Sequence, residues 1–217
     1  MPEIPLIQKI IIFAIPIIFA ITVHEVAHGW VASKLGDQTA RLLGRLTLNP
    51  LKHMDPIGTV LLPLFMIVTT GIAFGWAKPV PVDWRNLRQP KRDMALVAVA
   101  GPAANLVMLI IWTLFMMLVN QLPGISPYAM LLLHEMGTVG IIINIILIAL
   151  NLLPLPPLDG SRIVAAFLSP AMAMKYHQLE RWGLVILIVM MFTGVLGKIL
   201  QPMVSLLLSL VEPLLAG

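Results

Sequence analysis

Residues 5–35 read PLIQKIIIFAIPIIFAITVHEVAHGWVASKL, and from Ile10 to Val23 the run is apolar except for Thr22. A helix needs about 20 residues to cross the hydrocarbon core of a bilayer. The segment is therefore long enough to span a membrane and protrude from it. It continues past the length of a signal peptide and shows no clear small-x-small cleavage site, so we interpret it as a retained helix.

The composition of the whole chain indicates that a bilayer is its solvent. Of its 217 residues 59% are hydrophobic and 11% are charged, whereas soluble domains average about 25% charged residues. The net charge of +4 lies mostly between apolar runs, which fits positively charged cytoplasmic loops better than a nucleic-acid partner. Without cysteine, any metal site must use histidine, aspartate or glutamate.

Further apolar runs predict the fold class. They cover residues 56–74, 94–119, 128–153, 182–196 and 199–211. We expect an all-α polytopic membrane protein with about 4–6 transmembrane helices, forming a single membrane-embedded domain over residues 1–217. The glycines and prolines of residues 36–55 predict turns and a small β-hairpin after the first helix.

The distribution of lysine and arginine predicts the topology. The segments 34–55, 75–93 and 154–181 are basic, whereas 120–127 carries neither residue. By the positive-inside rule the basic segments are cytoplasmic and 120–127 is external. Residues 56–74 then cannot cross once, and we expect a re-entrant segment there. The protein is expected in the inner or plasma membrane as a multi-pass protein.

The first apolar segment ends in a metal-binding pattern. His24 and His28 are four residues apart, so on a helix they share one face, about 6 Å apart along the axis. Glu25 follows the first histidine, as in the His-Glu-x-x-His motif in which two imidazoles hold Zn²⁺ and the glutamate is the general base. Ionisable residues in an apolar helix are costly and by default functional.

A catalytic zinc usually takes three protein ligands, and Asp159 is the strongest further candidate. Three prolines between Asn151 and Asp159 prevent a regular helix there, and Gly160 permits a close backbone approach. Under the charge scheme Asp159 lies on the same side as His24 and His28. The alternative is that Asp159 caps a helix that begins near Ser161, and both interpretations stay open at this point.

Three motifs together resemble the site-2 protease family of intramembrane zinc metalloproteases. They are His24-Glu25-Val26-Ala27-His28, Gly101-Pro102-x-x-Asn105, and Asn151-x-x-Pro154-x-x-x-Leu158-Asp159-Gly160. The resemblance implies one Zn²⁺ per chain held by His24, His28 and Asp159, with Glu25 as catalytic base. It also implies that Asn105 holds the substrate backbone or the developing oxyanion, and we expect Asn151 to bind substrate as well. The chain resembles the compact type of the family, without a PDZ or CBS domain.

The expected function is hydrolysis of peptide bonds in membrane-spanning protein substrates, with the active site towards the cytoplasmic side. The expected partners are such a substrate and the lipid bilayer, and the sequence leaves the oligomeric state open. An edge strand from residues 40–48 or 72–82 is expected to clamp an unwound substrate segment. The alternative is a metal-transporting or metal-sensing membrane protein with the same ligands, which would have no need of Glu25. For Asn144, helix–helix contact and proximity to the active site are equally good interpretations.

Overall fold

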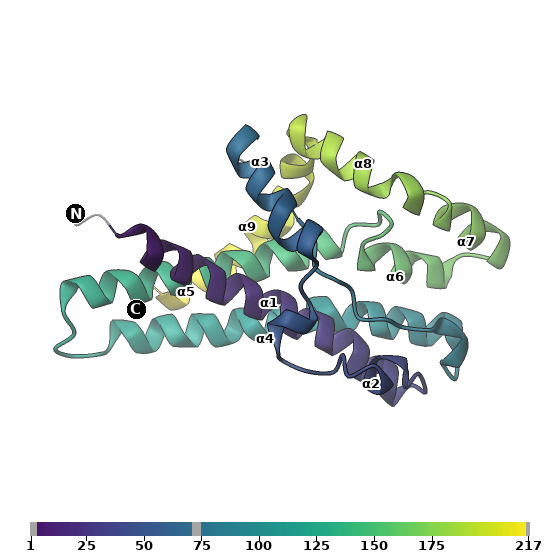
Figure 1. The fold of residues 1–217 in the computed structure, drawn as a ribbon, viewed down its shortest axis with the longest axis horizontal. Coiled ribbons are helices and arrows are strands. Elements are labelled where there is room, and N and C mark those ends of the chain that lie inside the picture. Colours follow the sequence, from purple (N-terminus) through teal and green to yellow (C-terminus); the bar gives the residue numbers. More distant parts are fainter. Residues whose placement is uncertain (1–3, 71–74, 216–217) are drawn as a thin grey trace.

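The computed structural model describes residues 4–70 and 75–215, and every regular element in these ranges is helical. The order is shown in Figure 1. The elements are α1 Leu6–Lys34, α2 Thr39–Leu42, the 3₁₀ turn η1 Pro50–Lys52, the π-helical segment η2 Pro56–Leu61, α3 Leu62–Thr70, the 3₁₀ turn η3 Trp84–Asn86, α4 Pro90–Asn120, α5 Pro127–Asn151, α6 Asp159–Phe167, α7 Pro170–His177, α8 Glu180–Phe192 and α9 Val195–Leu215. The predicted all-α polytopic class is confirmed.

Among the described residues, four helices are long and apolar enough to cross a membrane. They are α1, α4, α5 and α9, with 29, 31, 25 and 21 residues. At about 1.5 Å per residue each reaches roughly the 30 Å of a hydrocarbon core. Large apolar side chains such as Phe13, Ile111 and Leu210 are exposed on them, which is the surface that lipid would cover. The number of spans agrees with the predicted range, and the chain is a membrane protein.

The predicted β-hairpin in residues 36–55 is wrong, because that described stretch contains no strand. The short helix α2 occupies part of it, and the backbone N–H groups of Gly44 and Arg45 return to Arg41 and Ala40. The side chain of Asn49 caps η1 by accepting from the N–H of Leu51. Local turns thus satisfy the backbone groups that a hairpin would have paired. The prediction that residues 40–48 form an edge strand that clamps the substrate is wrong for the same reason.

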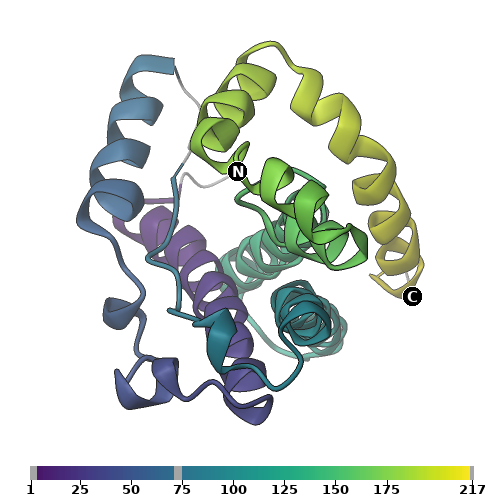
Figure 2. The same cartoon turned by 90° about the vertical axis from the view of Figure 1, so that its right-hand side faces the viewer.

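Residues 56–74 were expected to re-enter the membrane. The described part forms η2 and then α3, and residues 71–74 lie outside the described residues. Asp55 caps the start of η2 by accepting from the N–H groups of Ile57 and Gly58. Figures 1 and 2 show α3 projecting away from the packed helices α1, α4 and α5. The re-entrant path stays a prediction.

The helices α1, α4 and α5 form the packed centre. Figure 2 views this centre down the long axis of the molecule. A core cluster joins α4, α5 and α9; its buried members are Leu109, Met116, Ile141, Ile145, Ile148 and Val211. Gly140 on α5 lets α4 approach, because a Cβ there would lie 2.2 Å from the Trp112 ring. The later half of α1, the earlier half of α4, the end of α5 and the start of α6 meet at the end of this bundle away from the α4–α5 turn. The site lies there.

Candidate metal centre

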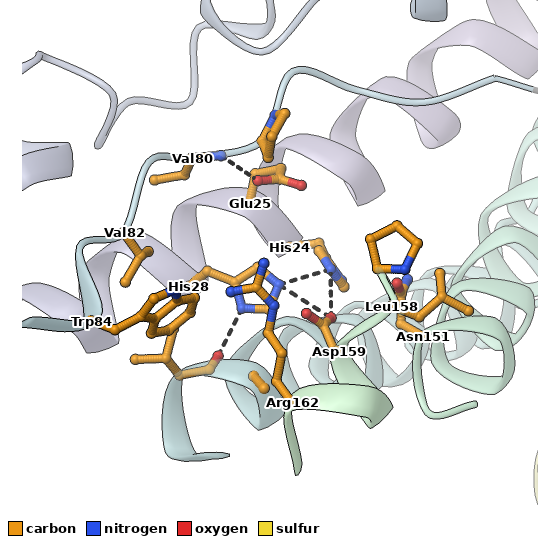
Figure 3. Close-up of a pocket in the computed structure, with 14 residues that line it drawn as sticks. His24, Glu25, His28, Val80, Val82, Trp84, Asn151, Leu158, Asp159 and Arg162 are labelled. Carbon is orange, nitrogen blue, oxygen red and sulfur yellow. Dashed lines mark hydrogen bonds and ion pairs between the residues drawn. The ribbon is translucent and has the colours of Figure 1, made fainter. Parts of the chain in front are cut away.

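Two histidines of α1 and the first residue of α6 converge on one point. The Nε2 atoms of His24 and His28 lie 3.0 Å apart, and each lies 3.2 Å from Oδ2 of Asp159. Their side chains are only 8%, 11% and 13% exposed, so little water competes for these atoms. This is the metal-ligand cluster found in the described ranges, and Figure 3 shows the three side chains pointing toward one another.

The hydrogen bonds on the far side of each imidazole define its tautomer. Nδ1 of His28 lies 2.7 Å from the carbonyl oxygen of Val97, which can only accept, so this nitrogen carries the proton. Nδ1 of His24 lies 2.6 Å from Oδ1 of Asn105 and donates in the same way. Both Nε2 atoms therefore present lone pairs to the shared point, as metal-ligating histidines do.

The donor set fits a zinc ion. Three acceptor atoms face one another, and Oδ2 of Asp159 is buried without a hydrogen-bond donor, an arrangement that a cation between them would stabilise. In a tetrahedral site with bonds of about 2.0–2.2 Å the ligand atoms lie about 3.3–3.6 Å apart, close to the distances found here.

Asp159 reaches the histidines because of the chain around it. It is the first residue of α6, and Leu158 occupies the cap position without a side-chain bond. The capping interpretation of Asp159 is therefore not what the structure shows. A Cβ on Gly160 would lie 2.3 and 2.4 Å from the carbonyl oxygens of Leu152 and Leu153. Glycine is thus required where the start of α6 meets the two residues that follow α5.

Gly101 explains how α4 comes so close to the two histidines. A Cβ at this position would lie 2.5 Å from Cε1 of His24 and from Nε2 of His28. Any larger residue would push into the imidazoles. Sequence reasoning used Gly101 only as part of a motif, although a Gly-Pro pair inside an apolar span was a usable sign of close helix packing.

Glu25 lines a cavity that borders the three ligand candidates, and its carboxylate is turned toward the non-helical residues 75–83. The backbone N–H of Val80 donates to Oε2 of Glu25 at 2.7 Å. Val80 stands between Pro79 and Pro81 in residues 75–83, which form neither helix nor strand. Sequence reasoning did not single out Val80, and a backbone donor leaves no signal in a sequence.

The cavity beside the three ligand candidates holds about 260 Å³. Glu25 and Asn151 line it, as do Trp84 and Arg162. The Arg162 guanidinium stacks over the Trp84 ring at 4.4 Å. Arg162 follows Asp159 by three residues on α6 and so shares its face, a spacing that could have found it in the sequence.

Asn105 stands apart from this lining. It is fully buried, and it lies on the side of His24 away from Asp159, where its amide nitrogen donates to Ala20 O at 3.3 Å and to Oδ1 of Asn144 at 2.9 Å. The structure thus brings Asn151 to the cavity and Asn105 to the histidine behind it. The predicted contact of either asparagine with substrate stays a prediction.

Comparison with known proteins found similar chains among bacterial proteins that carry the name "Putative zinc metalloprotease". YwhC of Bacillus subtilis (strain 168) is 39% identical over 193 residues, which cover 88% of this chain and 84% of YwhC. Rip2 of Mycolicibacterium smegmatis is 31% identical over 186 residues, 83% of this chain and 66% of Rip2. Rip2 of Mycobacterium tuberculosis (strain H37Rv) is 26% identical over 182 residues, 82% of this chain and 65% of that protein. No family model and no solved structure matches the chain.

Proposed function

Because the chain belongs to the zinc metalloprotease family that includes YwhC and Rip2, we propose that it is an intramembrane endopeptidase of the site-2 protease type. Its substrates would be membrane-spanning proteins, cut at or inside the bilayer. One observation carries the proposal. His24, His28 and Asp159 converge beside a cavity that also holds Glu25, among helices long and apolar enough to cross a membrane.

Each residue has a role that its position supports. His24, His28 and Asp159 would hold a Zn²⁺ ion, which when bound would act as a Lewis acid towards the scissile carbonyl and make water a better nucleophile near neutral pH. Glu25 takes the proton of the attacking water and passes it to the leaving amine. The N–H of Val80 holds the Glu25 carboxylate in place. Asn151 lines the cavity and would bind the substrate backbone.

The substrate must present an extended segment to this cavity, because the peptide groups of an intact helix are already hydrogen-bonded and shielded. The predicted clamp strand at 72–82 is wrong for its described part, because residues 75–82 form neither strand nor helix; residues 72–74 lie outside the described residues. The N–H groups of Trp76 and Lys78 donate to Gly58 O and His53 O within the protein. Pro79 and Pro81 have no N–H group, so this segment offers few donors to a substrate strand.

The basic segments indicate on which side of the membrane the site lies. The cavity lies at the end of the bundle that carries the basic segments, so we propose that it opens toward the cytoplasm. We also propose one zinc per chain and a metalloprotease domain that extends over residues 1–217. The proposed partners are the membrane-spanning substrate and the surrounding bilayer, without nucleic acid.

The test compares the wild-type protein with Glu25→Gln in detergent. Zinc is measured by elemental analysis, and cleavage is measured on a model transmembrane substrate with a central Gly-Pro or Asn-Gly break. We expect one zinc per chain in both proteins and cleavage by the wild type alone, because the amide cannot take a proton. Glu135→Gln is the matched control, since Glu135 is an exposed acid on α5. Equal cleavage by Glu25→Gln would refute the role of Glu25.

The transporter alternative makes a different prediction. It requires zinc uptake into liposomes that depends on His24 and His28 but not on Glu25. Within the described residues one metal-ligand cluster is found, whereas transport favours several sites along a path. Zinc in both proteins, no cleavage by either and uptake in liposomes would favour transport over the proposed function.

A further inference from the structure

Two asparagines are completely buried among the membrane-spanning helices. Asn105 on α4 and Asn144 on α5 are both 0% exposed, and neither lines the cavity beside the metal centre. Polar side chains inside such helices are costly unless their donors and acceptors are paired. The hydrogen-bond partners of Asn105 and Asn144 therefore indicate the role of the two side chains.

The carbonyl oxygen of Gly140 determines which atom donates in each of these hydrogen bonds. The carbonyl oxygen of Gly140 can only accept, so the amide nitrogen of Asn144 donates to it at 2.8 Å. Oδ1 of Asn144 then faces Asn105 and accepts from its amide nitrogen at 2.9 Å. The same nitrogen donates to Ala20 O at 3.3 Å. Two acceptors thus orient the Asn105 amide and turn its oxygen toward His24.

The last bond reaches the metal centre. Oδ1 of Asn105 accepts from Nδ1 of His24 at 2.6 Å, so Nδ1 holds the proton and Nε2 keeps its lone pair for a cation. If the Asn105 amide were reversed, its NH₂ group would face Nδ1 and the imidazole proton would move to Nε2. A proton on Nε2 would compete with the metal for the same lone pair.

We propose that Asn105 and Asn144 form a hydrogen-bond relay that positions His24 for the metal, with Asn144 as the distal anchor on α5. The relay crosses three helices, because His24 lies on α1, Asn105 on α4 and Asn144 on α5. It rests on the proposed function insofar as His24 is a metal ligand. It assigns Asn105 to the histidine rather than to the substrate, and it selects the active-site interpretation of Asn144.

The test measures zinc affinity of the full chain by competition with a chelator. Loss of a partner that orients a metal-ligating histidine costs about 10–100-fold in metal affinity. We expect Asn105→Leu to fall in that range and Asn144→Leu to weaken zinc binding about tenfold. Thr113→Val is the matched control, since Thr113 is also a buried polar residue of α4 but bonds only within its helix, to Leu109 O. It should leave zinc affinity unchanged.

A second measurement reads the relay directly. Nuclear magnetic resonance of ¹⁵N-histidine in the chelator-treated full chain at alkaline pH distinguishes imidazoles protonated at Nδ1 from those protonated at Nε2. We expect His24 to be protonated at Nδ1 in the wild type and in Thr113→Val. In Asn144→Leu a share of His24 should carry its proton on Nε2. If the leucine variant does not fold, Asn144→Ala serves the same comparison with a smaller side chain.

The outcomes separate this inference from the proposed function. Unchanged zinc affinity and an unchanged His24 tautomer in a folded Asn144 variant would overturn the relay. A raised KM in Asn105→Leu with unchanged zinc affinity would also overturn the relay, and it would indicate that Asn105 binds substrate. If the wild type binds zinc but cleaves no substrate, the proposed function fails, while the affinity and tautomer comparison still decides the relay.

Discussion

The backbone N–H of Val80 donates a 2.7 Å hydrogen bond to the carboxylate of Glu25, 55 residues earlier in the chain. The flanking Pro79 and Pro81 have no N–H group, so Val80 holds the single backbone donor in this stretch of three residues. The bond joins residues 75–83, which form neither helix nor strand, to the helix that carries both histidines. It holds the proposed base at the wall of the cavity.

Removing this donor should impair catalysis without removing the metal. In Val80→Pro the N–H is lost, and the Glu25 carboxylate is free to rotate. We expect kcat to fall about tenfold, a part of the 10²–10⁴-fold that general-base catalysis contributes, with zinc content unchanged. Val80→Ala keeps the N–H and is the control. A Val80→Pro protein with the kcat of Val80→Ala would show that the bond does not position the base.

Gly101→Ala should disrupt the metal centre, because its Cβ would lie 2.5 Å from both imidazoles. We expect zinc affinity to fall by at least about tenfold, comparable to losing an orienting partner. The matched control is Gly197→Ala on α9, where a Cβ meets no atom within 4 Å. That substitution should be neutral or stabilising, since alanine is favoured over glycine in helices by about 1 kcal/mol. Full zinc binding by Gly101→Ala would contradict the close packing.

Asp159→Asn should weaken zinc binding more than any variant of the asparagine relay. An amide has no negative charge to balance the cation, so the loss should exceed the about 10–100-fold typical of an outer partner. Elemental analysis after dialysis against a chelator measures it. Asp83→Asn is the control, because Asp83 pairs with the exposed Arg85 at the surface, and such pairs contribute little. Retention of zinc by Asp159→Asn would exclude Asp159 as a ligand.

Asp37 should make the fold sensitive to acid. Burial would raise its pKa, but hydrogen bonds from Thr39, Asn86 and the backbone N–H of Asp83 outweigh it and lower that pKa below its usual value. A depressed folded-state pKa means that the stabilisation is present above the unfolded pKa of about 3.9 and is lost as pH falls through the folded pKa.

The measurement for Asp37 is the thermal midpoint of unfolding in detergent across this pH range. We expect the wild-type midpoint to fall below about pH 4. An amide side chain cannot ionise, so Asp37→Asn should lower the neutral-pH midpoint by about 2–4 °C, the shift that about 1 kcal/mol produces in a chain of this size. The thermal midpoint of the variant should also fall less than that of the wild type on acidification. An identical pH profile for both proteins would show that Asp37 does not contribute.

Much of this protein could be predicted from the sequence because the deciding features are local. The apolar runs around residues 94–119 and 128–153 are long enough to require helices in a bilayer, and the structure has α4 and α5 there. His24 and His28 share a face because a helix repeats every 3.6 residues. Asp159 was expected beside them from its motif and its side of the membrane, and the structure gathers all three.

Only the tertiary structure decided how segments far apart in the chain meet. The backbone of residues 36–55 closes into local turns instead of a hairpin, because bonds such as Arg45 N–H to Ala40 O satisfy it first. The amide of Asn105 faces His24, and the carboxylate of Glu25 faces Val80. Each depends on the relative placement of helices and loops, which is set by packing between distant residues rather than by the local pattern of side chains.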